Sequence, residues 1–169
     1  LFPPYLEGAL TLFDYGHKSL MPLLFAAKDR GDRKIVLFFA RLYAARRNEL
    51  CAPVDLVTFA PRRKSSVWKN GFDQSAMLSE DFAALCGLPW QKVLRRRGFS
   101  RRQHGLAREA RMQNAKNKFC VCRNVRGKTI LLIDDVITTG ATVASCAQAL
   151  KEAGAAQVYA MALFRGGVL

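Results

Sequence analysis

The sequence predicts an α/β fold in which an open parallel sheet is flanked by helices. Residues 129–133 form a nearly continuous apolar run, which is typical of a strand covered on both faces. Apolar residues then recur at helical spacing over 141–153, and a second apolar run occupies 157–163. A strand, a helix and a strand in this order form a βαβ unit. Its strands are parallel, and ligands of such sheets bind at the carboxyl ends of the strands.

The first half of the chain is expected to add three helices and one strand. Helical spacing of apolar residues indicates helices at 20–25, 35–43 and 74–85, with a turn at 29–32 between the first two. A run of β-forming residues at 56–59, bounded by prolines, predicts a buried strand.

The segment 95–118 differs from the rest because it is basic and poor in branched apolar residues. We expect a mobile excursion from the sheet with a short helix near 106–115. This segment would be a small hood or flexible-loop region.

The composition predicts one domain over residues 1–169. Half of the 169 residues are apolar, which is enough for one core and little for two. No apolar run reaches the roughly 18 residues that a membrane span needs, so we expect no membrane partner. Five cysteines scattered in apolar surroundings favour a reducing, cytoplasmic location. Because the chain begins with Leu1 instead of Met, we expect the natural protein to extend upstream.

The net charge of +14 predicts an anionic partner. The cations gather at 62–64, 95–97 and 101–102, and at Arg108 and Arg111. Nucleic acid and the phosphates of a small ligand would both be attracted, and charge alone does not choose between them.

The best candidate site follows the apolar strand at 129–133. It consists of two acids, Asp134 and Asp135, and a loop with Thr138, Thr139, Gly140, Ala141 and Thr142. Hydroxyls, a glycine and free N–H groups at a helix start form a site for phosphate. Two buried carboxylates need hydrogen-bond donors or a cation, which the vicinal hydroxyls of a ribose with bound Mg²⁺ would supply. The alternative is that Thr138 and Thr139 only cap the helix.

Residues 130–142 as a whole resemble the phosphoribosyl-diphosphate signature of type I phosphoribosyltransferases. The resemblance implies the fold of that family. It also implies that Asp134 and Asp135 hold the ribose 2′ and 3′ hydroxyls, and that residues 138–142 hold the 5′-phosphate. Mg²⁺ would be held through the ligand near the two acids, without direct protein ligands.

A wider set of residues is similar to the ComF subgroup of this family, which is associated with competence. The set comprises Phe13, Asp14, Tyr15, Gly16, Lys28, Gly31, Ala60, Pro61, Gly71, Phe72, Asp73, Gln74, Gln103, Leu106, Arg111, Asn114 and Phe119. Many members carry a zinc module upstream, which implies a zinc ribbon before Leu1. Two departures are Asn70 and Asp73 in place of the usual Arg and Asn of Arg-Gly-Phe-Asn, and Ala60 in place of the usual valine before proline. The first puts in doubt any role that needs an arginine at position 70.

The resemblance also assigns a pyrophosphate loop to Arg62, Arg63 and Lys64. Three cations beside backbone amides suit a diphosphate leaving group, although a solvated basic turn would look the same in sequence. The segment 95–111 corresponds in position to a mobile hood that excludes water on closing. Solvated surface or nucleic-acid contact remains open for that segment.

No general base stands out. Purine-salvage relatives place an acid at the position of Thr138, and a hydroxyl is no base near neutral pH. His17 and His104 are expected on the surface. Cys120 and Cys122 are too close together for the usual zinc spacing, so we expect no zinc in this chain.

The family resemblance implies Mg²⁺-dependent transfer of phosphoribose from 5-phosphoribosyl 1-diphosphate to an unidentified acceptor, with release of diphosphate. The rival hypothesis is a non-catalytic, competence-related module that binds single-stranded DNA through its basic surface. A ligand-sensing regulator is a third hypothesis, but the sequence has no recognisable DNA-reading helix pair. A second copy of the chain, forming a homodimer, is a further candidate partner.

Overall fold

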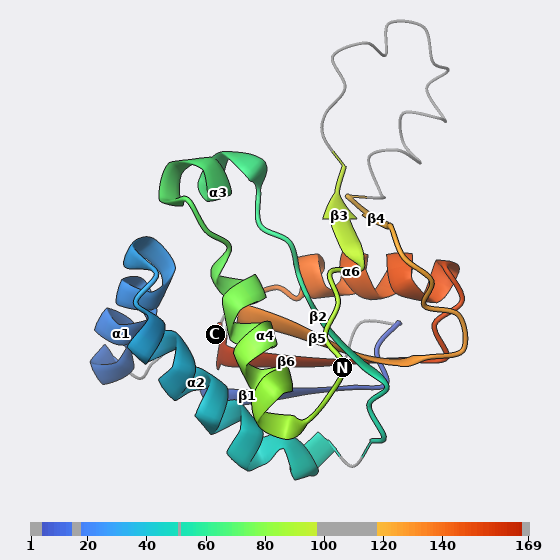
Figure 1. The fold of residues 1–169 in the computed structure, drawn as a ribbon, viewed down its shortest axis with the longest axis horizontal. Coiled ribbons are helices and arrows are strands. Elements are labelled where there is room, and N and C mark those ends of the chain that lie inside the picture. Colours follow the sequence, from blue (N-terminus) through green and yellow to red (C-terminus); the bar gives the residue numbers. More distant parts are fainter. Residues whose placement is uncertain (1–4, 15–17, 51, 98–117, 167–169) are drawn as a thin grey trace, which may run out of the picture.

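The computed structural model describes residues 5–14, 18–50, 52–97 and 118–166 and contains a four-stranded parallel sheet (Figure 1). The strands are β1 (Gly8–Asp14), β2 (Leu56–Phe59), β5 (Thr129–Ile137) and β6 (Gln157–Arg165). Their order across the sheet is β1-β6-β5-β2, and each neighbouring pair is parallel. The predicted fold class is therefore confirmed, with β5 in the interior of the sheet.

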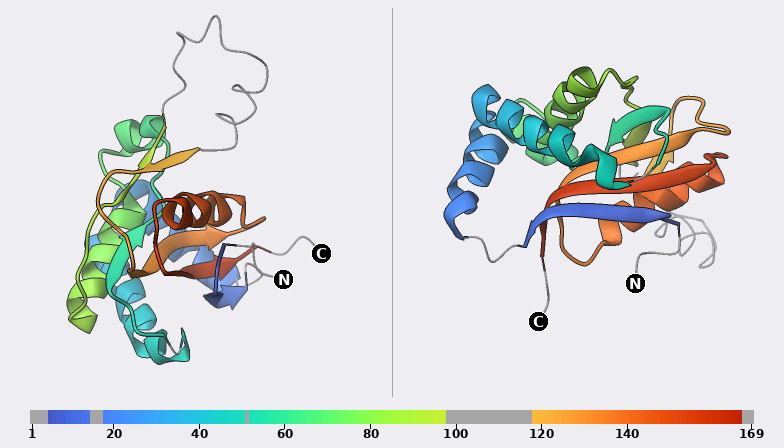
Figure 2. Two further views of the ribbon diagram at one scale, coloured as in Figure 1. Left: turned by 90° about the vertical axis from the view of Figure 1, so that its right-hand side faces the viewer. Right: turned by 90° about the horizontal axis from the view of Figure 1, so that it is seen from below.

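Helices cover both faces of the sheet (Figure 2). One face carries α1 (Met21–Phe25), η2 (Ala26–Arg30), α2 (Arg33–Arg46) and α4 (Gln74–Cys86), and the other carries α6 (Ala141–Glu152). Short 3-10 turns, η1 (Lys18–Leu20) and η3 (Arg47–Leu50), precede α1 and follow α2. The side chain of Asp32 caps α2 by accepting from the backbone N–H groups of Lys34 and Ile35. Gly87 ends α4 in the left-handed conformation that glycine adopts without strain.

Two hydrophobic clusters result because successive side chains of β5 point to opposite faces. Leu131 and Ile133 pack with the α2 and α4 side, where Tyr43 and Phe82 are fully buried. Ile130 and Leu132 pack with α6 on the other side. Burial on both faces explains the continuous apolar run in the sequence.

An antiparallel pair of short strands, β3 (Leu94–Arg96) and β4 (Phe119–Val121), stands beside the sheet. The guanidinium of Arg96 lies 5.1 Å from the centre of the Phe119 ring, which fixes the base of the pair. The expected excursion at 95–118 therefore begins within β3, and β4 follows directly after it. The helix expected near 106–115 lies outside the described residues.

The predicted strands at 56–59 and 157–163 and the predicted helices at 35–43, 74–85 and 141–153 agree with the structure to within a few residues. The strand β1 and the helix α3 (Lys64–Asn70) were not predicted, and neither were β3 and β4. The first helical region continues through η2 into the predicted turn at 29–32, and β5 continues four residues past the predicted end at 133. In the described part of the chain, no helix is both long and apolar enough to cross a membrane.

Candidate functional site

The candidate site lies where β2 ends beside the last third of β5. Phe59 is paired with Ile133, and the backbone N–H of Ala60 donates to the Ile133 carbonyl at 3.0 Å. Because the strands are parallel, the loop after β2 and the acids of β5 emerge at the same edge of the sheet. The sheet thereby brings the two loops that the sequence singled out to one place.

Asp134 and Asp135 belong to β5 itself and do not follow it. Asp134 is paired with Ala162 of β6, so our placement of the acids after a strand ending at 133 was wrong. Both acids are buried, with 8% and 9% of their surface exposed. Each carboxylate accepts a hydrogen bond from the next backbone N–H: Asp135 N donates to Asp134 Oδ1 at 2.9 Å, and Val136 N donates to Asp135 Oδ1 at 2.8 Å.

Burial raises the pKa of Asp134 well above its ordinary value, because the charged carboxylate loses its hydration. The neighbouring charge of Asp135 raises that pKa further, and the charge of Lys28 opposes the shift. Burial likewise raises the pKa of the Cys146 thiol on α6. Asp134 therefore gains most from a partner that donates hydrogen bonds or carries positive charge.

Tyr43 ties the α2 layer to the acids. Its hydroxyl donates to the backbone carbonyl of Asp134 at 2.8 Å, and its ring stands edge-on to Phe82 at a centroid distance of 6.0 Å. Burial raises the pKa of Tyr43 well above its ordinary value, so the hydroxyl keeps its proton. This buried bond fixes the backbone at the first acid.

The loop after β5 leads into α6 through Gly140, whose φ of 73° lies in the left-handed region. Gly140 is the N-cap of α6, and no side chain caps this helix start. The nearest equivalent is a hydrogen bond from the Ala141 backbone N–H to Thr139 Oγ1 at 3.4 Å. The alternative that Thr138 and Thr139 together cap the helix is therefore not supported. A small hollow runs along this loop, lined by Asp134 and residues 136–143.

Gly166, just beyond β6, lies against this loop. Its backbone N–H donates to the Ile137 carbonyl at 2.8 Å. A Cβ added to Gly166 would come within 2.9 Å of Thr138 Cγ2 and 3.2 Å of Thr138 Cα. The close approach requires glycine here and sets the position of Thr138.

Three basic residues follow β2, and they differ in placement. Arg62 is partly buried, and its Nη1 donates to the Lys28 carbonyl at 3.4 Å. Arg63 is exposed and precedes α3. Lys64 begins α3, so the basic loop is shorter than predicted. Arg96 of β3 donates to the Pro61 carbonyl at 3.5 Å, which joins the base of the β3–β4 pair to this loop.

Sequence spacing did not identify Lys28 as part of the site. Lys28 lies in η2, and its ammonium nitrogen is 3.3 Å from Asp135 Oδ2. In the sequence it is only one of many positions that are similar to the ComF subgroup. His17 and His104 both lie outside the described residues.

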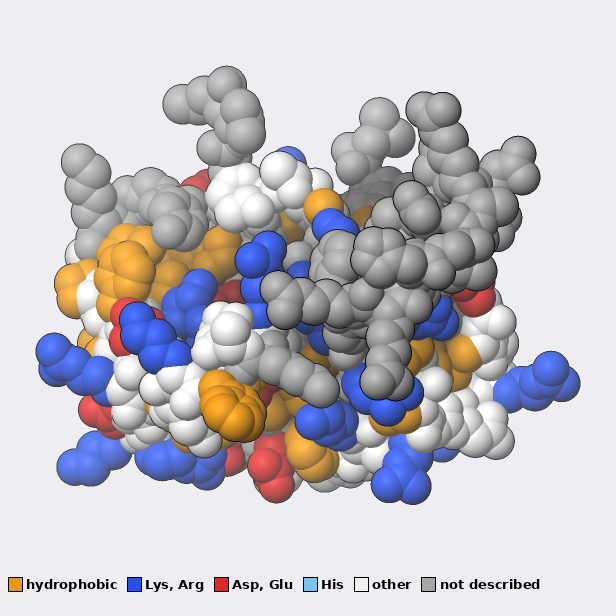
Figure 3. Space-filling view, turned by 90° about the horizontal axis from the view of Figure 1, so that it is seen from above, with side chains coloured by type: hydrophobic (Ala, Val, Ile, Leu, Met, Phe, Trp, Pro, Cys, Tyr) orange, Lys and Arg blue, Asp and Glu red, His pale blue; other side chains and the backbone are white. Residues whose placement is uncertain are grey.

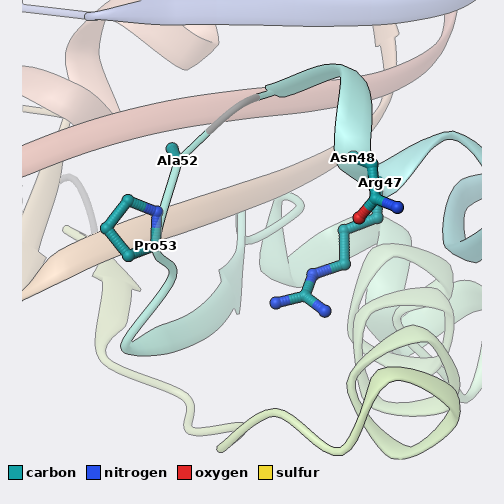
Figure 4. A pocket seen from close by; sticks show the side chains of 4 residues that line it. All are labelled: Arg47, Asn48, Ala52 and Pro53. Carbon is teal, nitrogen blue, oxygen red and sulfur yellow. The ribbon is translucent and has the colours of Figure 1, made fainter.

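A larger hollow lies elsewhere on the molecule. It has a volume of about 300 Å³ and is lined by Arg47, Asn48, Ala52 and Pro53, and Figure 4 shows Arg47 and Pro53 on facing sides. Its lining includes none of the predicted site residues. We therefore place the candidate site at the strand ends and not at the larger hollow.

Comparison with known proteins decides the family. A phosphoribosyl transferase domain model matches residues 99–168. The DNA utilization protein YhgH of Escherichia coli (strain K12) is 32% identical over 170 residues, which is 96% of this chain and 74% of the relative. Competence protein F of Haemophilus influenzae is 27% identical over 134 residues, covering 77% of this chain and 58% of the relative. The chain belongs to the YhgH and ComF family of phosphoribosyl transferase domains.

Solved structures agree with this family at the level of the fold. A glutamine phosphoribosylpyrophosphate amidotransferase from B. subtilis has a TM-score of 0.56 and 24% identity over 76% of this chain, which spans 26% of that enzyme. An adenine phosphoribosyltransferase from Leishmania donovani has a TM-score of 0.51 and 13% identity, covering 93% of this chain and 83% of that one. The predicted type I phosphoribosyltransferase fold is therefore confirmed.

Several ComF-like residues meet in one contact between η2 and the α3–α4 turn. Gly31, with a φ of 64°, faces Phe72 so closely that a Cβ would lie 2.8 Å from its ring. Asn70, which departs from the usual arginine, donates from Nδ2 to the Lys28 carbonyl at 3.0 Å. Asp73 caps α4 through the backbone N–H of Ser75 and also accepts from the Arg62 backbone N–H at 3.2 Å. Burial raises the pKa of Asp73, and these donors oppose the shift.

Proposed function

We propose that this protein binds 5-phosphoribosyl 1-diphosphate with Mg²⁺ and transfers its phosphoribosyl group to an acceptor, releasing diphosphate. One observation carries the proposal. Two buried carboxylates of β5 lie at the same sheet edge as an uncapped helix start and a basic loop. These are the partners that the hydroxyls, the 5′-phosphate and the diphosphate of this ligand require.

The acids suit the ribose. Asp134 and Asp135 are buried and already accept one backbone hydrogen bond each. A second donor would offset the cost of burying the charge, and ribose 2′ and 3′ hydroxyls can supply it. We therefore assign the two hydroxyls to these acids.

The loop of Thr138, Thr139, Gly140, Ala141 and Thr142 suits the 5′-phosphate. Backbone N–H groups at the start of α6 lack carbonyl partners within the helix, and the helix dipole favours an anion there. Thr138, Thr139 and Thr142 are exposed, so their hydroxyls are available to a phosphate.

In the transfer, a bond forms between the acceptor atom and C1′ of the ribose as the bond from C1′ to the diphosphate oxygen breaks. The diphosphate leaves with the electron pair, and the acceptor loses its proton to solvent. Negative charge develops on the leaving group, so cations at the site lower the barrier. We assign this role to the basic loop of Arg62, Arg63 and Lys64.

The described residues fit a Mg²⁺ ion held chiefly by the ligand. They contain no cluster of three or more His, Cys, Asp or Glu side chains that could hold a metal. Mg²⁺ usually keeps several waters and binds substrate phosphates, so the ion would be held through the ligand, near Asp134 and Asp135 but without direct bonds to them. The ion would neutralise diphosphate charge when bound.

The acceptor is expected to be nucleophilic without help from the protein. The described loop offers Thr138 where a base would be needed, and a hydroxyl does not accept a proton near neutral pH. An amine or an anion meets this condition.

The free thiols of Cys86, Cys120, Cys122 and Cys146 support a reducing, cytoplasmic setting.

The reaction is tested by measuring diphosphate release from phosphoribosyl diphosphate with a panel of amines and bases. We expect release with at least one acceptor, and a loss of roughly a hundredfold or more in Asp135→Asn, as for a lost transition-state contact. Glu80→Gln, on the exposed side of α4, is the charge-matched control and should keep the wild-type rate. No release with any acceptor, or equal rates in Asp135→Asn and wild type, contradicts the proposal.

A second candidate function is binding of single-stranded DNA, and one observation favours it. Trp68 on α3 is 90% exposed, and its neighbours Arg63 and Lys69 are exposed cations. Lys and Arg side chains are spread over the face of the molecule shown in Figure 3, and α3 lies on this face. Exposed aromatic rings among cations are typical of surfaces on which unpaired bases stack. The relatives named for DNA utilization and competence are consistent with this alternative.

The alternative is tested by measuring affinity for single-stranded DNA across a salt series. If the basic surface binds the DNA backbone, affinity decreases as salt is added. A plot of the logarithm of affinity against the logarithm of salt concentration should then have a slope of about −0.7 for each neutralised phosphate. Replacing Arg101 and Arg102, which lie outside the described residues, should flatten the slope. Steep salt dependence without turnover on any acceptor would favour the DNA-binding module over the enzyme.

A further inference from the structure

Lys28 is a cation at the site that neither the phosphate signature nor the basic loop includes. It lies in η2, 107 positions before Asp135 in the sequence, and its ammonium nitrogen is 3.3 Å from Asp135 Oδ2. Its side chain is 33% exposed, whereas that of Asp135 is 12% exposed. The ammonium group thus reaches from the surface to a buried carboxylate.

The backbone at Lys28 is held in place from the other side of the site. Its carbonyl accepts from Asn70 Nδ2 at 3.0 Å and from Arg62 Nη1 at 3.4 Å. Gly31, three residues later, is packed directly against the ring of Phe72. These contacts hold the main chain of η2, whereas the side chain of Lys28 is partly exposed to solvent.

The charges at the site create a need for such a cation. Asp134 and Asp135 are adjacent and buried, and the proposed ligand carries negative charge on its phosphates. Two uncompensated carboxylates would repel that ligand. Among the described residues, Lys28 is the cation that forms an ion pair with either acid.

The chemistry of the ligand shows where this ammonium group would turn. The ribose hydroxyls are on C2′ and C3′, and the diphosphate is on the neighbouring C1′. A cation in contact with a carboxylate that holds these hydroxyls is therefore within reach of the diphosphate. A lysine is a compact charge on a flexible stem, which suits a change of partner.

We propose that Lys28 is a ligand-contacting residue that neutralises Asp135 before the ligand binds and contacts the diphosphate afterwards. This inference rests on the proposed function. On binding, the ribose hydroxyls replace the ammonium group at Asp135, and the ammonium group follows the diphosphate. The diphosphate is then held from two sides, by the basic loop and by η2.

Affinities measured by calorimetry for three probes in the presence of Mg²⁺ test this role. The probes are phosphoribosyl diphosphate, inorganic diphosphate and ribose 5-phosphate. Lys28→Met should weaken the affinity for phosphoribosyl diphosphate and for inorganic diphosphate by about tenfold or more, as for loss of a charged hydrogen bond. It should weaken the affinity for ribose 5-phosphate by less than about threefold. Lys28→Arg should restore most of the loss. Lys34→Met, which removes an exposed lysine of α2, is the control for net charge.

A second pair of variants distinguishes direct contact of Lys28 with diphosphate from neutralisation of the Asp135 charge. In the Asp135→Asn background there is no charge at position 135 to neutralise. If Lys28 touches the diphosphate, adding Lys28→Met still weakens inorganic diphosphate by about tenfold. If the effect of Lys28→Met disappears in that background, or if ribose 5-phosphate is weakened as much as diphosphate, the inference is wrong. A wild type that binds none of the probes contradicts the proposed function as well, whereas binding that Lys28→Met leaves unchanged overturns only the role of Lys28.

Discussion

The buried hydroxyl of Tyr43 offers a direct test of how the core supports the site. In Tyr43→Phe the ring can stay in place against Phe82, so the change removes one hydrogen bond, 2.8 Å long, to the Asp134 carbonyl. A buried hydrogen bond contributes about 0.5–1.5 kcal/mol net, and an unpaired buried group costs more. Because Tyr43 is fully buried, we expect a loss of about 1–1.5 kcal/mol in the free energy of unfolding.

For a chain of this size, that loss lowers Tm by about 2–6 °C. Urea unfolding followed by circular dichroism measures the free energy. Tyr159→Phe is the matched control, because among the described residues its hydroxyl has no hydrogen-bond partner. The loss should be the same in neutral and mildly alkaline solution, since burial holds the pKa of Tyr43 well above its ordinary value. A Tyr43→Phe protein no less stable than the control would refute the argument that this bond fixes the backbone at Asp134.

Asp134, Gly166 and Trp68 can each be tested by a single substitution. Burial raises the folded-state pKa of Asp134 above its unfolded value of about 3.9, so its contribution to stability is greatest in acid and is lost as pH rises through the folded pKa. The free energy of unfolding of Asp134→Asn, measured with urea over a series of pH values, should therefore rise relative to that of the wild type as pH rises. A difference that stays constant with pH would contradict the raised pKa of Asp134. Gly166→Ala should weaken the binding of ribose 5-phosphate by about tenfold, because the added Cβ displaces Thr138. Gly8→Ala is the control and should leave this affinity unchanged, because its Cβ meets Tyr159 at an ordinary distance of 3.4 Å. Equal affinities of the two variants would show that the loop tolerates the displacement. If single-stranded DNA binds at α3, Trp68→Ala should cost about 1–3 kcal/mol in binding measured by fluorescence anisotropy, and Phe38→Ala, exposed on α2, should cost nothing.

The βαβ unit and its ligand loop were predictable because they rest on local patterns. The apolar run of β5, the helical spacing of α6 and the run of β6 each identify an element without knowledge of its neighbours. The same patterns misplaced the end of β5. Asp134 and Asp135 suggested the end of a strand, but pairing with β6, including Val136 with Phe164, extends β5 beyond them.

The elements that were missed lack a local signal. The strand β1, with sequence GALTLFD, lies at the sheet edge, and its β-branched and aromatic residues are limited to Thr11 and Phe13. The helix α3, with sequence KSSVWKN, has no apolar periodicity and leaves Trp68 exposed. Lys28 was missed as a site residue because its contact with Asp135 depends on how η2 packs against the α3–α4 turn. Residue spacing does not report such a long-range contact.

In our proposal, the two acids of β5 and the loop before α6 form a site for phosphoribosyl diphosphate. The most direct measurement is the change in free energy of unfolding when this ligand and Mg²⁺ are added to wild type and to the variant with both Asp134→Asn and Asp135→Asn. Ligand at a hundredfold excess over its dissociation constant should stabilise the wild type by about 2.7 kcal/mol, and the double variant should gain far less. No stabilisation of the wild type, or equal stabilisation of both proteins, would contradict the claim.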